Sequence, residues 1–166
     1  MSQDGVSPVQ PAPQEIVQNR KRRNLLAAEN GGHIVAATSD LWSVTIDGRD
    51  EAAEGYYIDP KSREEAIYAF KDNQPATFDA FAILIPRTDG TNIKEFELLV
   101  AKDSPREGFS SIGRFQTQNI RVFNDPYQEF KFRPVTARYL KFKPIANFGS
   151  PAYMWLSEFK LYGSLN

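Results

Sequence analysis

The stretches of sequence that decide the fold lie near the end of the chain and read Phe132-Arg133-Pro134-Val135-Thr136-Ala137-Arg138-Tyr139-Leu140-Lys141-Phe142 and Met154-Trp155-Leu156-Ser157-Glu158-Phe159-Lys160-Leu161-Tyr162-Gly163. In the first stretch, Tyr139 alternates with Leu140 and Phe142. In the second, apolar residues share one face and polar residues the other: Trp155, Phe159 and Leu161 against Glu158, Lys160 and Tyr162. A two-residue period is typical of a half-buried strand, so we predict that both stretches are strands.

Short strands separated by turn residues are predicted for the rest of the chain. The candidates are residues 33–38, 42–46, 66–71, 77–86, 93–102, 109–117, 120–123 and 127–132. The turn Asp89-Gly90-Thr91-Asn92 joins two of them in a hairpin-like connection. No segment shows helical periodicity beyond about one turn. Roughly eight to ten strands at this spacing predict an all-β fold, an antiparallel β-sandwich.

The chain divides into a tail and one domain. Residues 1–23 contain Pro8, Pro11 and Pro13 without sustained periodicity, which predicts a flexible linker, and residues 24–166 are predicted to form the folded domain. Neither a run of about 18 apolar residues nor the apolar segment of a signal peptide occurs, so we expect no membrane span. Because the start resembles a cut in a linker, we expect a monomeric module of a longer, multidomain protein.

Composition excludes several classes of function. Twenty basic and 21 acidic residues give a net charge of -1, which argues against a nucleic-acid partner. The one basic cluster, Arg20-Lys21-Arg22-Arg23, is predicted to be a solvated linker, with nuclear localisation or an anionic surface as alternatives. The absence of cysteine excludes disulfides, cysteine-based catalysis and cysteine-ligated zinc. Twelve Phe, seven Tyr and two Trp predict an aromatic core between two sheets.

Catalytic patterns are missing from the sequence. The single histidine, His33, follows Gly31-Gly32 at a predicted strand entry, and a structural or exposed role fits it better than that of a base. No nucleophile elbow accompanies it, and the carboxylates follow no acid/base spacing. The glycine pair also lacks a phosphate-binding pattern. We therefore predict that the chain is not an enzyme.

The two closing stretches also carry a family resemblance. Pro-Val-x-Ala-Arg-Tyr-Leu-Lys followed by Ser-Glu-Phe-x-Leu-Tyr-Gly resembles the closing strands of discoidin-like domains, which include coagulation-factor C-type domains and family 32 carbohydrate-binding modules of the galactose-binding-like superfamily. Asn24-Leu25-Leu26-Ala27, Ile46-Asp47-Gly48 and residues 78–104 resemble earlier parts of such domains, with residues 78–86 and 93–104 as paired central strands. The resemblance implies a jelly-roll β-sandwich that binds carbohydrate, in an extracellular or cell-surface setting.

A structural calcium ion is the cofactor that the sequence suggests. Calcium prefers six to eight oxygen ligands, and the turn Asp47-Gly48-Arg49-Asp50-Glu51 offers carboxylates and carbonyls close together. The resemblance implies that Asp47, Asp50 and Glu158 hold the ion. The alternative is that Asp47-Gly48 is a simple turn and Glu158 a solvated or salt-bridged strand residue.

Loop residues are the candidates for ligand binding. Aromatic rings stack on the C–H faces of sugars, while polar side chains pair with hydroxyl groups. The predicted ligand-binding residues are Arg49, Tyr56, Tyr57, Asn147, Phe148 and His33. Trp42 and Trp155 are predicted to lie in the core instead. The predicted function is non-catalytic carbohydrate recognition through loops at one end of the sandwich. The alternatives are a protein-protein interaction or structural accessory domain and, less favoured by the short loop 39–42, phospholipid binding.

Overall fold

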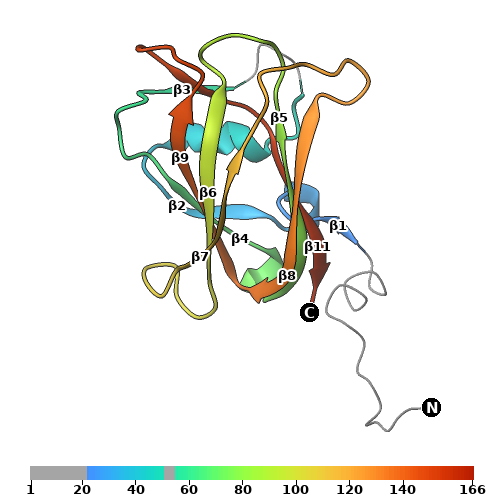
Figure 1. The fold of residues 1–166 in the computed structure, drawn as a ribbon. Coiled ribbons are helices and arrows are strands. Elements are labelled where there is room, and N and C mark those ends of the chain that lie inside the picture. Colours follow the sequence, from blue (N-terminus) through green and yellow to red (C-terminus); the bar gives the residue numbers. More distant parts are fainter. Residues whose placement is uncertain (1–21, 51–54) are drawn as a thin grey trace, which may run out of the picture.

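The computed structural model describes residues 22–50 and 55–166, which form an antiparallel β-sandwich (Figure 1). One sheet has the order β1 (Arg23–Asn24), β11 (Phe159–Leu165), β5 (Ala76–Leu84) and β8 (Tyr127–Ala137). The other has the order β2 (His33–Ala37), β4 (Ala66–Ala69), β9 (Tyr139–Asn147), β6 (Ile93–Ala101) and β7 (Ser110–Gln116). A two-stranded ribbon pairs β3 (Tyr56–Ile58) with β10 (Met154–Leu156). The predicted fold class is confirmed.

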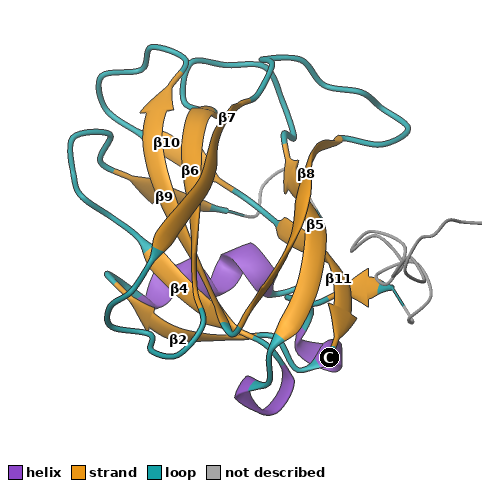
Figure 2. Ribbon diagram, turned by 60° about the horizontal axis from the view of Figure 1, so that its bottom comes forward, coloured by secondary structure: helices purple, strands orange, loops and turns teal. Residues whose placement is uncertain are grey.

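Three 3-10 helices complete the described part of the chain, and Figure 2 shows them as short segments beside the sheets. They are η1 (Ala28–Asn30), η2 (Asp40–Ile46) and η3 (Lys71–Asn73). The side chain of Ser39 caps η2 by accepting a hydrogen bond from the backbone N–H of Leu41 at 3.2 Å. This helix carries Trp42 into the core, where its side chain is fully buried, as the sequence predicts.

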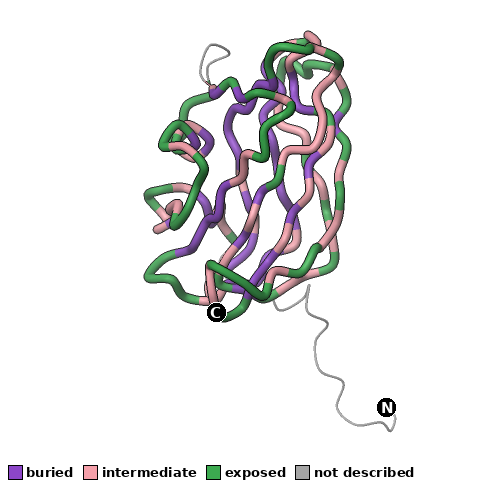
Figure 3. The backbone as a smooth tube through the Cα atoms, turned by 90° about the vertical axis from the view of Figure 1, so that its left-hand side faces the viewer, coloured by how far each residue is buried: buried purple, intermediate pink, exposed green. Residues whose placement is uncertain are grey.

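The core is a stack of aromatic rings between the two sheets. Phe142 of β9 lies at its centre, with ring centroids 4.3 Å from Phe159, 5.0 Å from Phe96, 5.8 Å from Phe81 and 6.0 Å from Trp42. All five side chains are fully buried. Figure 3 shows the buried positions running along the strands while exposed positions gather at the loops. The aromatic composition therefore fills the space between the sheets, as predicted.

Several predicted strands match the structure closely. Residues 33–38, 77–86, 93–102 and 109–117 correspond to β2, β5, β6 and β7. Two predictions are wrong. Residues 42–46 belong to η2, because burial of Trp42 and Thr45 follows a helical turn. Residues 120–123 are loop and expose Ile120, Val122 and Phe123 to solvent, so their apolar character does not reflect a strand.

The two closing stretches are each divided. The first leaves one sheet at Ala137 and enters the other at Tyr139, and the backbone N–H of Arg138 between them donates to the carbonyl of Ala101 at 3.1 Å. The second is split into β10 and β11. Because Ser157 and Glu158 intervene, the core-facing phase shifts by one residue: Met154 and Leu156 face the core before the break, Phe159 and Leu161 after it. The prediction that Trp155 shares their face is therefore wrong.

The predicted hairpin between residues 77–86 and 93–102 does not form. β5 pairs with β11 and β8, whereas β6 pairs with β9 and β7 in the other sheet. The resemblance to paired central strands fails for the same reason. The loop that joins β5 to β6 spans residues 85–92, which is long enough to cross the roughly 10 Å between packed sheets. This crossing places the loop at the end of the sandwich that carries β3 and β10 (Figure 1).

The predicted division into a tail, residues 1–23, and a domain, residues 24–166, stays a prediction, because residues 1–21 lie outside the described residues. Arg22 is described, and its guanidinium lies 2.7 Å from the carboxylate of Asp79 on β5. Within residues 22–50 and 55–166, none of the helices has the length and apolar character that a membrane span requires.

Candidate functional site

An aromatic cluster lies at the loop end of the sandwich, where β3 pairs with β10. In β3, Tyr56 and Ile58 face the interior, so the alternation of the strand turns Tyr57 outward. The ring of Tyr57 lies 4.5 Å from that of Trp155 on β10 and 5.0 Å from that of Tyr153. Tyr57 is 44% exposed and Tyr153 54% exposed, whereas Trp155 is buried. We call Tyr57, Tyr153, Trp155 and Arg87 the loop-end cluster.

Arg87 supports this cluster from the loop between β5 and β6. Its guanidinium lies 4.6 Å from the ring centroid of Trp155, and its Nη2 donates a hydrogen bond to the Tyr57 hydroxyl at 2.9 Å. Its Nε donates to Oδ2 of Asp89 at 2.7 Å. Hydrogen bonds from Thr91 and Arg87 lower the pKa of the Asp89 carboxyl, which therefore stays ionised as the partner of the guanidinium. The cluster is thus held in one arrangement before any ligand binds.

Two asparagines fix the loops that carry the cluster. Asn147 donates from Nδ2 to the carbonyls of Ser150 at 2.8 Å and Tyr153 at 2.7 Å, so its amide holds the loop that presents Tyr153. Asn92 is buried and donates to the carbonyl of Arg87 and to Oδ1 of Asn119. The loops before β6 and β8 are therefore tied together beneath the cluster.

Glycine is required beside Trp155. A Cβ atom at Gly55, which precedes β3, would lie 2.3 Å from Cζ2 of the Trp155 ring. No real side chain tolerates that distance, so the close approach of the backbone to the indole depends on glycine.

The structure separates the predicted ligand-binding residues. Tyr57 belongs to the loop-end cluster, but its neighbour Tyr56 is buried and its hydroxyl donates to Glu64 at 3.3 Å. Phe148 is half-buried, with the Lys94 ammonium 6.0 Å from its ring centroid.

The remaining two predicted residues lie elsewhere. His33 opens β2, and its Nε2 lies 3.0 Å from Oδ1 of Asn73 in η3, away from the residues of the loop-end cluster. Arg49 is exposed beside Asp47, and its backbone N–H donates to Oδ1 of that aspartate at 2.9 Å.

Sequence reasoning missed Arg87, and it predicted a core position for Trp155, which is buried in the structure beneath Tyr57. Arg87 directly follows the predicted strand 77–86 and stands two residues before Asp89, a spacing that suggests a local ion pair. Nothing local connects it with Tyr57, because the two residues lie 30 positions apart and meet only in the folded domain. The position of Arg87 at the start of a loop could have suggested a role in a loop-end site, but it does not show which aromatic residue the arginine contacts.

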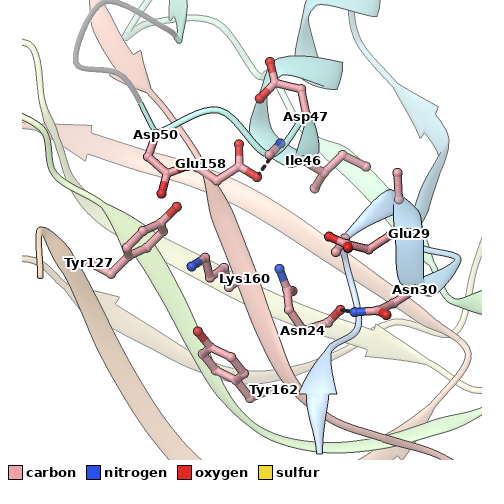
Figure 4. A pocket seen from close by; sticks show the side chains of 13 residues that line it. Asn24, Glu29, Asn30, Ile46, Asp47, Asp50, Tyr127, Glu158, Lys160 and Tyr162 are labelled. Carbon is pink, nitrogen blue, oxygen red and sulfur yellow. Dashed lines mark hydrogen bonds between the residues drawn. The ribbon is translucent and has the colours of Figure 1, made fainter.

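A second feature is a cavity of about 480 Å³ on the outer side of the four-stranded sheet, which we call the Glu158 pocket (Figure 4). Glu158 connects β10 to β11 and is only 4% exposed. The backbone N–H of Gly48 donates to its Oε2 at 2.9 Å, while its Oε1 has no hydrogen-bond partner among the described residues. The lining residues labelled in Figure 4 are Asn24, Glu29, Asn30, Ile46, Asp47, Asp50, Tyr127, Glu158, Lys160 and Tyr162.

Burial dominates the electrostatics of this pocket. Loss of hydration on burial is the main cause that raises the pKa of Glu158; the hydrogen bond from the Gly48 N–H lowers it, and the nearby carboxyls of Asp47 and Asp50 raise it, with a net pKa of about 8. The native state thus favours the protonated form of Glu158 at neutral pH. Burial also raises the pKa of the Tyr127 phenol, which therefore keeps its proton.

The structure brings the three predicted calcium ligands, Asp47, Asp50 and Glu158, to the same pocket. The unpartnered Oε1 of Glu158 beside two aspartates is the oxygen chemistry that calcium prefers. Among the described residues, however, no three acidic or histidine side chains converge closely enough to form a ready metal site. Glu51, the other carboxylate of the predicted turn, lies outside those residues. Calcium binding stays a prediction.

The fold is that of galactose-binding-like β-sandwich domains, which confirms the predicted resemblance. The model of the Sad1 / UNC-like C-terminal family matches residues 77–165, more than half of the 166 residues, and the chain belongs to that family. It is 26% identical over 145 residues to SUN domain-containing protein 4 of Arabidopsis thaliana. That alignment covers 86% of this chain and 23% of the relative, so the chain spans less than a quarter of the relative's length.

Solved structures share the fold at low sequence identity. The C-terminal domain of a chitobiase from Bacteroides fragilis has a TM-score of 0.65 at 18% identity, covering 88% of this chain and 99% of that one. The family 32 carbohydrate-binding module of Clostridium perfringens NanJ, solved in complex with galactose, has a TM-score of 0.62 at 11% identity, covering 86% and 99%. Chitosan-binding module 1 of a Paenibacillus chitosanase/glucanase has a TM-score of 0.58 at 14% identity, covering 85% and 99%.

Proposed function

We propose that this domain is a non-catalytic recognition module that binds carbohydrate at the loop-end cluster. The observation that carries the proposal is the pair of exposed rings, Tyr57 and Tyr153, held 5.0 Å apart on a support of Trp155 and Arg87. Exposed aromatic faces stack on the C–H faces of a sugar ring, and rings that are already fixed lose little conformational freedom on binding. Similar solved domains that bind galactose and chitosan support this ligand class.

The charge of the cluster favours a neutral sugar. The guanidinium of Arg87 is paired with the ionised carboxylate of Asp89, so the two charges offset each other beneath the rings. An acidic sugar would gain little from an arginine that is already neutralised, and it would approach the carboxylate as well. We therefore expect the cluster to prefer neutral sugars, namely hexoses and N-acetylated amino sugars.

Removing both rings tests this placement. We expect the double variant Tyr57→Ala, Tyr153→Ala to bind its best glycan at least about fivefold more weakly, since each aromatic contact contributes about 0.5–1.5 kcal/mol. The measurement is a glycan-array screen of the full chain followed by titration of the strongest hit. Phe123→Ala is the matched control, because it removes an 80% exposed ring from a neighbouring loop. Unchanged affinity in the double variant would contradict the placement.

A protein-docking role is the second candidate. The loop between β7 and β8 exposes Ile120, Val122 and Phe123, and an exposed apolar group beside a binding site is typical of a partner contact. Membership of the Sad1 / UNC-like C-terminal family is compatible with this role. A blank glycan array from a folded chain would favour it over carbohydrate binding. We also propose that the domain works in an extracellular or cell-surface setting. We further propose that it is one part of a longer, multidomain protein.

A structural calcium ion held by Asp47, Asp50 and Glu158 would stabilise the folded domain. We expect calcium at 100 times its Kd to add about 2.7 kcal/mol, which raises Tm by roughly 5–10 °C for a chain of this size. Thermal melts in calcium and in chelator measure the difference. Asp47→Asn should reduce it, whereas Asp103→Asn, an exposed carboxylate in the loop between β6 and β7, should not. Identical melts in calcium and chelator would exclude the ion.

A further inference from the structure

The hydroxyl of Tyr57 keeps a hydrogen-bond donor that the folded domain does not use. Nη2 of Arg87 donates to the hydroxyl oxygen at 2.9 Å. A guanidinium has donors and no acceptor, so Arg87 cannot take the hydroxyl proton in return. In the part of the chain that the structure describes, no other group accepts that proton. The proton is therefore available to a ligand at the loop-end cluster.

This donor is accessible, and it is polarised by a charged neighbour. Tyr57 is exposed, and its hydrogen bond with Arg87 lies at the protein surface, so a ligand can reach the hydroxyl. A hydroxyl that accepts a hydrogen bond from a cation donates its own proton more strongly. The guanidinium is fixed in place by its bond to Asp89 at 2.7 Å and by the ring of Trp155 at 4.6 Å. The direction of the donor is thus set before a ligand binds.

The surroundings of the hydroxyl favour one kind of acceptor. The ring of Tyr153 is 54% exposed and lies 5.0 Å from the ring of Tyr57, so an apolar face adjoins the donor. The acetamido group of an N-acetylhexosamine combines a carbonyl, which only accepts, with a methyl group. A sugar hydroxyl also accepts a hydrogen bond, but it has no apolar part to place on the ring. The acetamido group therefore makes two favourable contacts where a hydroxyl makes one.

We propose that Tyr57 determines the specificity of the loop-end cluster, because its hydroxyl selects N-acetylhexosamines by donating to the acetamido carbonyl. Arg87 is a positioning residue, since it orients and polarises the hydroxyl without touching the sugar. This inference rests on carbohydrate binding at the loop end and names the class of sugar. A neutral acetamido group also leaves the ion pair between Arg87 and Asp89 intact.

The test uses matched sugars that differ only at carbon 2. The methyl glycosides of N-acetylglucosamine and glucose form one pair, and those of N-acetylgalactosamine and galactose form the other. Titration of the full chain with each sugar, followed by ¹H–¹⁵N spectra, gives the Kd values. In at least one pair we expect the N-acetyl sugar to bind at least about fivefold more tightly, the effect of a stronger hydrogen bond and a buried methyl group.

Substitutions separate the hydroxyl from the ring that carries it. Tyr57→Phe keeps the ring, and it should weaken binding of the N-acetyl sugar about three- to tenfold and reduce its preference over the matched sugar. Arg87→Met keeps an unbranched stem against Trp155 and should also reduce the preference, because the hydroxyl loses its charged donor. Tyr139→Phe is the matched control, since it removes a hydroxyl from β9 outside the cluster. It should bind all four sugars as the wild type does.

The outcomes distinguish this inference from the proposed function. Equal Kd values within both pairs, or a Tyr57→Phe variant that keeps the full preference, would overturn the role of the hydroxyl. Weaker glycan binding by the double variant Tyr57→Ala, Tyr153→Ala would still support a sugar site at the loop end. The absence of saturable shifts with all four sugars would also overturn the inference, and the glycan array would then decide the proposed function independently.

Discussion

Replacing Phe142 with alanine is expected to lower the free energy of unfolding by about 3–5 kcal/mol, the cost of truncating a buried phenylalanine. Phe142 is fully buried, and its ring packs against Phe159, Phe96, Phe81 and Trp42 within 6.0 Å between centroids. These neighbours come from both sheets and from η2, so the surrounding backbone cannot collapse into the cavity without separating paired strands. A loss of this size is a large fraction of the stability of a typical domain.

Urea unfolding followed by tryptophan fluorescence measures this change, because Trp42 lies next to the substituted ring. Phe123→Ala is the control, since an 80% exposed ring contributes little to the core and should change stability by less than about 0.5 kcal/mol. If both variants lost a similar amount, the aromatic stack would not be the main apolar core of the domain.

The sequence was most informative where one strand lies entirely within one sheet. Residues 93–102 and 109–117 match β6 and β7 closely, and within β6 the buried Phe96, Leu98 and Val100 alternate with less buried neighbours. It was misleading where the chain changes sheets. At Arg138 one apolar run passes from β8 into β9 without a turn residue, and at Ser157 the phase shifts by one position. The two-residue period of apolar residues is preserved on each side of such a break. The alternation within a short stretch therefore does not reveal where the chain changes sheets.

The candidate sites were harder to predict than the strands, because they are formed by residues that lie far apart in the sequence. The outward position of Tyr57 follows from alternation in β3, but its support by Arg87 joins residues 30 positions apart. The resemblance to discoidin-like domains predicted that Asp47 and Glu158 lie near each other, and the hydrogen bond from Gly48 to Glu158 spans 110 positions. The spacing of residues in the sequence did not by itself predict that these two residues lie close together. Asn147 was selected for its polarity, yet its amide supports the loop that carries Tyr153.

Glu158→Gln is expected to stabilise the domain at alkaline pH and to change little at acidic pH. In the native state, burial raises the pKa of Glu158 from 4.5 to about 8, with the carboxyls of Asp47 and Asp50 acting in the same direction. Well below pH 4.5, both the native and the unfolded state hold the proton, so burial of the carboxyl does not change the free energy of unfolding with pH. Between pH 4.5 and 8 the unfolded state loses its proton while the native state keeps it, so the free energy of unfolding falls as pH rises.

The size of this effect follows from the shift. The difference of 8 − 4.5 = 3.5 pKa units corresponds to at most about 5 kcal/mol, and the opening of the pocket to solvent screens part of it. We therefore expect Glu158→Gln to exceed the wild type by about 2–4 kcal/mol at pH 8–9 and to match it within about 0.5 kcal/mol near pH 4.5. The amide oxygen of glutamine can still accept the hydrogen bond from Gly48, so the loop that contains Asp47 keeps its anchor.

Urea unfolding from pH 4.5 to 9, with chelator present throughout to exclude calcium, measures both curves. Glu107→Gln, which alters an exposed carboxylate in the loop between β6 and β7, should follow the wild-type curve at every pH. Parallel curves for Glu158→Gln and the wild type would mean that Glu158 ionises as freely in the native state as in the unfolded one. Diverging curves would mean that the fold holds a carboxyl out of water at a cost in stability, which is expected of a group retained for binding rather than for packing.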